Sequence, residues 1–277
     1  MKIFSRSIAI LALPLLLMIS AGAHAQLKSG DNPEASEVWR KVRASLFQGR
    51  AIQAAAPEML KLDAPLRAED AAIVPIAIRS QLPAGDKRRI AKLYLVIDNN
   101  PSPIAAIFEF SLASGPADIE TRVRIDEYTH VRAIAEMDDG QLLMALRFVK
   151  ASGGCSAPPG KDPAAALASL GKMRLRVDGE LKRGQPALAQ LMISHPNHSG
   201  LAMDQSTRQF TPADFVRRVT VSYAGEPVLV ADLDFAISEN PNFRFHFVPQ
   251  GDGLLKAEFV DTQERRFEST LALAPAR

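Results

Sequence analysis

The sequence predicts an all-β protein in which a flexible, cysteine-bearing arm joins two β-sandwiches and a short helix precedes them. Stretches of strand length with alternating apolar and polar residues recur along most of the chain, and turn-forming residues separate them. This pattern is typical of antiparallel sandwiches. One long break, rich in Gly, Ser, Ala and Pro, begins at residue 151 and divides the strands into two groups.

The chain begins with the features of a secretory signal peptide. Two basic residues precede an apolar run over residues 8–20, and "AHA" at residues 23–25 forms a cleavage pattern, so we assign residues 1–25 to the signal. The run is too short for a good membrane anchor, and no later apolar run is long enough to span a bilayer.

The charge balance narrows the classes of partner. The chain has 33 basic and 31 acidic residues; removing Lys2 and Arg6 with the signal leaves 31 of each. A near-neutral protein with 6% aromatic residues gives no argument for nucleic-acid binding. After signal cleavage we therefore expect neither nucleic acid nor membrane as a partner.

The first sandwich is expected within residues 32–150. It opens with a helix over residues 32–48, where Asn32 and Pro33 form a start signal and Trp39 is a core anchor on the apolar face. "DDG" at residues 138–140 predicts a hairpin. Strands are expected at residues 71–81, 90–100, 104–112, 119–126, 129–137 and 142–151.

Residues 151–183 are assigned to the arm and a linker that contains a short helix ending at Gly171. The second sandwich is expected within residues 184–277. In "NFRFHF" three phenylalanines alternate with Arg244 and His246, so the phenylalanines are expected in the core. The strands of this half are expected at residues 188–196, 215–225, 228–238, 242–249, 254–262 and 265–274.

The only cysteine of the chain, Cys155, lies in the break, within "KASGGCSAPPG". An unpaired thiol outside the cytoplasm is exposed to oxidation and cross-linking, which argues for a function. Gly153 and Gly154 give the arm flexibility, and the two prolines beyond stiffen its base. The pattern predicts a thiol on a mobile tether; the alternative is a linker cysteine without a role.

These segments resemble two families of sulfur-oxidation proteins. "RFVKASGGCSAP" resembles the carrier arm of SoxY, which ends in Gly-Gly-Cys-Gly-Gly, and the block containing "PADF", "SENP" and "FRFHF" resembles SoxZ, the immunoglobulin-like partner of SoxY. The whole is similar to SoxY–SoxZ fusion carriers associated with quinoprotein dehydrogenases. It departs from SoxY at Ser156 and Ala157, where SoxY has glycines, and in having an internal arm.

The resemblance implies two immunoglobulin-like sandwiches, SoxY-like at residues 32–150 and SoxZ-like at residues 184–277. It further implies a periplasmic carrier that holds a sulfur-containing cargo covalently on Cys155. The carrier would present this cargo to periplasmic redox enzymes, which are c-type cytochrome or quinoprotein dehydrogenase systems. The alternative is a non-covalent accessory module that docks such a dehydrogenase, with Cys155 dispensable.

Other reactive side chains give weaker patterns. The sequence has no G-x-S-x-G, Cys-x-x-Cys or H-E-x-x-H motif, so we expect neither an enzyme nor a cofactor. Met192, His195, His198 and Met203 are soft ligands suited to copper. Their spacing is no established ligand set, and a strand would point the two histidines to opposite faces, so no metal site is expected. A metal chaperone is the distant third alternative.

Overall fold

The computed structural model describes residues 32–83, 86–158, 163–204 and 207–276, so the predicted signal peptide lies outside the described residues. Nearly all described elements are strands, which confirms the all-β class and the short N-terminal helix. In chain order the elements are η1 (Pro33–Ala35), α1 (Glu37–Phe47), β1 (Ile52–Ala54), β2 (Leu60–Asp63), β3 (Val74–Ser80), β4 (Ile90–Ile97), β5 (Ile104–Phe110), β6 (Ile119–Val123), β7 (Thr129–Met137), β8 (Leu142–Val149), α2 (Pro163–Ser169), β9 (Met173–Asp178), β10 (Ala187–Ile193), β11 (Val216–Tyr223), β12 (Glu226–Leu233), β13 (Asn242–Phe247), β14 (Gly253–Asp261) and β15 (Arg266–Leu273).

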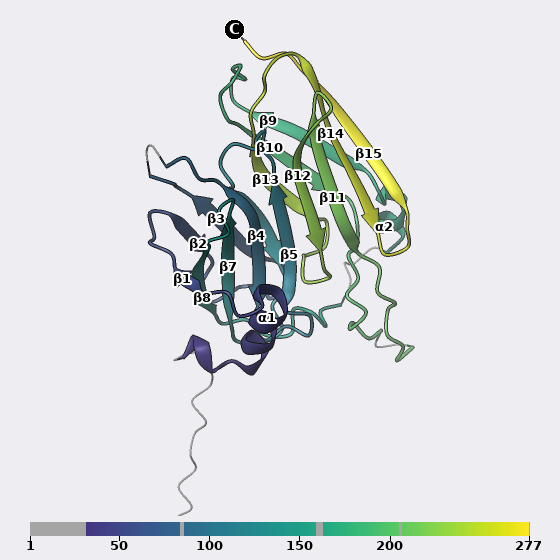
Figure 1. The fold of residues 1–277 in the computed structure, drawn as a ribbon. Coiled ribbons are helices and arrows are strands. Elements are labelled where there is room, and N and C mark those ends of the chain that lie inside the picture. Colours follow the sequence, from purple (N-terminus) through teal and green to yellow (C-terminus); the bar gives the residue numbers. More distant parts are fainter. Residues whose placement is uncertain (1–31, 84–85, 159–162, 205–206, 277) are drawn as a thin grey trace, which may run out of the picture.

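The strands form two sheets, and both sheets run through both halves of the chain (Figure 1). The nine-stranded sheet has the order β1-β8-β7-β4-β5-β12-β11-β14-β15, and the six-stranded sheet has the order β2-β3-β6-β13-β10-β9. The halves meet where β5 pairs with β12 and where β6 pairs with β13, both antiparallel. The predicted all-β sandwich class is thus confirmed, and the structure adds that the sheets are continuous between the two halves.

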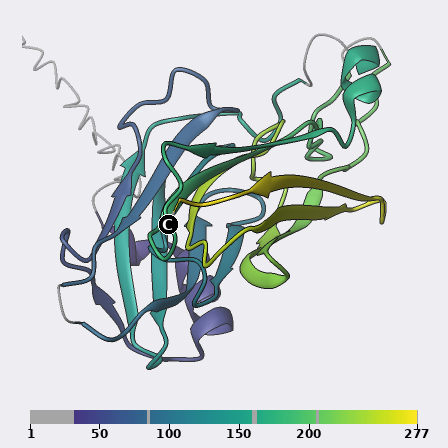
Figure 2. The same ribbon diagram turned by 90° about the horizontal axis from the view of Figure 1, so that it is seen from above.

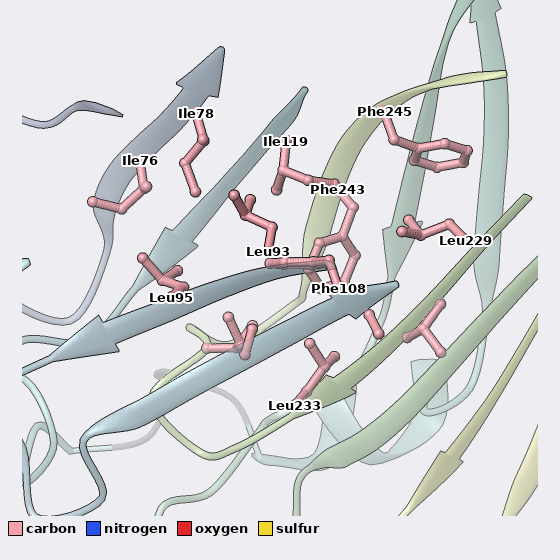
Figure 3. Packing of buried hydrophobic residues seen from close by; sticks show 14 of the residues in the cluster. Ile76, Ile78, Leu93, Leu95, Phe108, Ile119, Leu229, Leu233, Phe243 and Phe245 are labelled. Atoms are coloured by element: carbon pink, nitrogen blue, oxygen red, sulfur yellow. The ribbon is translucent and has the colours of Figure 1, made fainter. Parts of the chain in front are cut away.

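One hydrophobic core fills the space between the sheets and extends across the junction. Phe108 of β5 lies edge-on to Phe243 of β13, with ring centroids 6.2 Å apart, so an aromatic contact crosses from one half to the other (Figure 3). Phe243, Phe245 and Phe247 are all buried, which confirms the face predicted for β13. Burial of this shared apolar surface fixes the two halves to each other.

The N-terminal helix covers the outer face of the nine-stranded sheet (Figure 1). Trp39 of α1 is buried against apolar residues of β4, β7 and β8, which confirms its role as a core anchor. Arg132 of β7 is also fully buried; it donates two hydrogen bonds to Asp98, at 2.8 and 2.7 Å, and its guanidinium carbon lies 4.2 Å from the Trp39 ring centroid. Because α1 covers this face, β7 is buried on both sides.

Several local predictions changed in detail. The expected helix divides at Ser36: Asn32 and Pro33 open a separate 3-10 turn, and the Ser36 hydroxyl caps α1 by accepting the N–H of Trp39 at 3.0 Å. The "DDG" hairpin is confirmed between β7 and β8, with Gly140 at a positive φ of 86°. Two short strands, β1 and β2, were not predicted.

The region assigned to arm and linker, residues 151–183, contains sheet as well as connection. β9 pairs antiparallel with β10 at the edge of the six-stranded sheet. The predicted short helix corresponds to α2. Seen from above, α2 and the yellow β14–β15 hairpin extend to the same side of the molecule, away from the purple N-terminal elements (Figure 2).

Candidate functional site

The segment that carries the single cysteine leaves the end of β8 and follows the junction between the halves. After β8 ends, Lys150 forms an isolated parallel bridge with Arg67: the N–H of Lys150 donates to Leu66, and its carbonyl accepts the N–H of Ala68. The chain then crosses the loop that follows β6. We call residues 151–156 the docked segment, because each of its central amides is bonded to the body of the protein.

Three consecutive N–H groups of the docked segment bind the β6–β7 connection. The N–H of Gly153 donates to the Asp126 carbonyl at 2.7 Å, and that of Gly154 donates to the Ile125 carbonyl at 3.0 Å. The N–H of Cys155 donates to the Asp126 carboxylate at 3.3 Å. The backbone is thus held from Gly153 up to the residue that bears the thiol.

Glycine is favoured at the two arm positions for different structural reasons. Gly153 has a φ of +78°, which favours glycine, and the direction of a Cβ is open space. A Cβ on Gly154 would instead lie 2.0 Å from the carbonyl oxygen of Ala71 and 2.7 Å from that of Ile125. Flexibility was the role predicted for both glycines; the structure shows close backbone packing at Gly154.

Cys155 itself is buried, with 1% of its surface exposed. The prediction placed this thiol on an exposed, mobile tether, so the structure corrects the environment of Cys155 while leaving its identity as the candidate nucleophile. Sequence reasoning missed the burial because the partners that cover Cys155 come from distant parts of the chain. Small residues around a cysteine are compatible with tight packing as well as with flexibility.

The C-terminal half holds the carbonyl of Cys155. The Ser199 hydroxyl donates to this carbonyl at 2.6 Å and also accepts the N–H of Leu201 at 3.1 Å. In the β6–β7 connection, Arg124 donates through Nη1 to the carbonyls of Phe235 and Ile237, at 2.9 and 2.7 Å. The thiol therefore lies at the seam between the halves, where both contribute contacts.

Burial dominates the chemistry of the thiol in this position. Burial raises the pKa of Cys155 from 9.0 to about 12, the Asp126 and Asp234 carboxylates add to the rise, and the Arg124 guanidinium opposes it. Burial also raises the pKa of Asp234 above its usual value. At neutral pH the docked cysteine is thus a neutral thiol, and the reactive species is the thiolate. In the docked position the thiol is therefore shielded from reaction.

The loop that bears Ser199 is fixed by a buried polar network. Asn197 donates its N–H to His195 Nδ1 at 3.0 Å, so the neutral imidazole carries its proton on Nε2. Nε2 lies 3.7 Å from Asp214 and 3.5 Å from Asp261. Arg265 donates to both carboxylates at 2.6 Å. Burial would raise the pKa of Asp261, but the hydrogen bonds from Arg265 outweigh it and lower that pKa.

This network also bears on whether these side chains hold a metal ion. Ligand atoms of His195, Asp214 and Asp261 lie within 4.8 Å of one another, yet the Arg265 guanidinium already supplies the positive charge that a cation would bring to these carboxylates. We therefore read the group as an anchor for the loop. His195 and His198 lie beyond the end of β10, so the strand geometry assumed for them was wrong; His198 instead pairs with Asp214 through backbone hydrogen bonds.

A cavity of about 900 Å³ lies elsewhere, over β3, β6 and β13. Arg122, Arg147 and Arg244 line it together with Leu66 and Phe148, and neither Cys155 nor the groups bonded to the docked segment border it. Among the described helices, none has the length and apolar character needed to cross a bilayer.

Two family models match this chain, one in each half. The model for "Sulfur oxidation protein SoxY" matches residues 43–155 and ends on Cys155. The model for "Sulphur oxidation protein SoxZ" matches residues 175–272. A comparison with curated proteins found no match.

Solved structures give weak overall similarities. The sulfur carrier protein SoxY from Chlorobium limicola f thiosulfatophilum is 23% identical over 41% of this chain and 94% of that chain, with a TM-score of 0.34. A superoxide reductase (neelaredoxin) from Ignicoccus hospitalis is 14% identical over 34% of this chain and 79% of that chain, with a TM-score of 0.30. Red sea bream transglutaminase is 12% identical over 88% of this chain and 34% of that chain, with a TM-score of 0.25. At these scores we draw no functional argument from the structures.

The identification rests on the two family models. They follow one another along the chain without overlap, and the boundary between them falls in the segment that joins the two halves. The chain belongs to the SoxY and SoxZ families and combines them as a SoxY–SoxZ fusion.

Proposed function

We propose that this protein is a periplasmic carrier that holds a sulfur-containing intermediate covalently on Cys155 and presents it to partner redox enzymes. The observation that carries the proposal is the position of the only thiol, at the last residue matched by the SoxY model and at the seam with the SoxZ half. The chemistry on the cargo belongs to the partners, so the protein is not itself an enzyme.

Loading is an oxidation. Joining the Cys155 sulfur to a sulfane sulfur anion, R–S⁻, forms one S–S bond, releases the thiol proton and removes two electrons. A periplasmic c-type cytochrome or quinoprotein dehydrogenase system is the class of partner that would accept these electrons. The presence of a single cysteine supports the role of Cys155 as a carrier, because the chain has no second thiol that could displace the cargo by forming an internal disulfide with Cys155.

The export signal predicted at residues 1–25 supports the periplasm as the location. It also makes the docked state useful, since a buried neutral thiol resists oxidation and cross-linking between turnovers.

The burial of Cys155 favours a second candidate, a non-covalent module that docks a periplasmic quinoprotein dehydrogenase. In this alternative the thiol is structural and never leaves its site. Cys155→Ser distinguishes the two candidates, because serine keeps the size of the side chain but cannot carry a sulfur cargo.

The test is sulfur-compound-dependent oxygen uptake by native cells that express wild type, Cys155→Ser or Ser156→Ala. Ser156 is the matched control: it is exposed and adjacent, and its hydroxyl makes only a 3.4 Å hydrogen bond to Gly153. A covalent carrier loses uptake in Cys155→Ser and keeps it in Ser156→Ala. Equal uptake in all three strains would instead support the docking module.

A further inference from the structure

The charges around the docked thiol are unbalanced. The Asp126 carboxylate accepts the N–H of Cys155, and the Asp234 carboxylate acts electrostatically on the same side chain. Asp234 Oδ1 is buried and has no hydrogen-bond partner among the described residues. Arg124 is the cation of the group, and its Nη1 is committed to two carbonyl oxygens. Among the described residues, two carboxylates thus act on the cysteine against one guanidinium.

The docked segment is also closely covered. Cys155 is buried, and Gly154 beside it cannot accept even one additional carbon, because a Cβ would overlap the Ala71 carbonyl. A sulfur group attached to Cys155 adds at least one large atom to a side chain that is already almost fully covered. When that group is an oxyanion, it also places a negative charge beside Asp126 and Asp234, in surroundings of low dielectric.

We propose that the docked site discriminates between the empty and the loaded arm: it retains the neutral thiol and rejects an anionic sulfur group on Cys155, with Asp126 and Asp234 as the residues that select by charge. This inference rests on the proposed function. A group attached to Cys155 acts as a ligand that only the undocked state accommodates, so attachment shifts the population toward that state. Loading would release the arm to partner enzymes, and unloading would return the thiol to its protected position.

The test uses three adducts of the purified full-length protein that differ in charge. Methanethiosulfonate reagents form a disulfide with Cys155 and release methanesulfinic acid, and they place on it a 2-sulfonatoethyl, a 2-hydroxyethyl or a 2-(trimethylammonio)ethyl group. The three groups are matched in their ethyl spacer. Complete labelling is confirmed by intact mass.

Hydrogen exchange reports docking directly, because the amides of Gly153, Gly154 and Cys155 are all bonded to the β6–β7 connection. We expect these amides to exchange at least tenfold faster in the sulfonate adduct than in the hydroxyl adduct. Asp126→Asn keeps an oxygen to accept the Cys155 N–H but removes the negative charge. We expect this variant to reduce the difference in exchange rate between the sulfonate and hydroxyl adducts. The amides of β4 and β7 serve as an internal reference.

Equal exchange in the sulfonate and hydroxyl adducts, or the fastest exchange in the cationic adduct, overturns the charge selection and leaves volume alone as the cause. These results do not depend on any cargo in the cell. The proposed function fails separately, if native protein never carries a sulfur group on Cys155.

Discussion

The substitution Gly154→Ala tests whether backbone packing holds the thiol in its buried position. The added Cβ would lie 2.0 Å from the Ala71 carbonyl oxygen, which is backbone and cannot rotate away. The docked segment is held by hydrogen bonds from three amides and to the Cys155 carbonyl. At about 1 kcal/mol each, these four bonds contribute about 4 kcal/mol. Each increment of about 1.4 kcal/mol corresponds to a tenfold change in an equilibrium constant. Losing all four bonds should therefore raise the population in which the thiol is exposed by up to about a thousandfold.

Gly153→Ala is the matched control, since a Cβ there meets nothing within 4 Å and only the φ of +78° is unfavourable. That conformation costs an alanine about 1 kcal/mol, which should raise the alkylation rate roughly fivefold. The assay is the rate of Cys155 alkylation by iodoacetamide at pH 8, followed by intact mass, with circular dichroism to verify the fold. Alkylation of Gly154→Ala at the rate of Gly153→Ala, or at the wild-type rate, would refute the packing argument.

Three further predictions follow from the same structure. Ser199→Ala removes the hydrogen bond that the C-terminal half donates to Cys155, so alkylation should accelerate about fivefold, for a bond of about 1 kcal/mol; an unchanged rate would show that Ser199 does not hold the segment. The docked pKa of about 12 lies above the ordinary 9.0, so docking is fully favoured below about pH 9 and weakens as the pH rises toward 12. The alkylation rate should therefore keep rising above pH 9, whereas levelling off there, as in a short peptide, would contradict the burial of the thiol. Trp39→Ala should destabilise the protein by about 3–5 kcal/mol in urea unfolding, because Trp39 is buried against the sheet and Arg132, whereas exposed Arg40→Ala should change stability by less than about 0.5 kcal/mol.

Much of the fold could be predicted because local sequence patterns, such as apolar–polar alternation and turn residues, specify it. Alternation in "FRFHF" identified the buried face of β13, and "DDG" identified the β7–β8 hairpin. The missed strands β1 and β2 are three and four residues long, too short for periodicity to be visible. The helix start was misplaced because Pro33 and Ser36 are both start signals, and only the Ser36 side chain caps α1.

The pairings between the halves could not be read from one sequence. The pairing of β5 with β12 joins residues more than 100 positions apart, and nothing in either strand specifies the other. The surroundings of Cys155 are non-local in the same way: Asp126, Ser199 and Asp234 reach it from three separate loops. Sequence reasoning could therefore find the candidate residue by its uniqueness, but not the buried position in which the structure places it.

The central claim is that Cys155 carries sulfur, and the most direct measurement is the intact mass of the protein purified from its native cells without reductant, compared with the mass after reductant. The account predicts an added mass on the Cys155 peptide, in units of sulfur or an oxidised sulfur group, that reductant removes. A plain thiol, or only a cross-linked dimer, in cells that are oxidising sulfur compounds would contradict it.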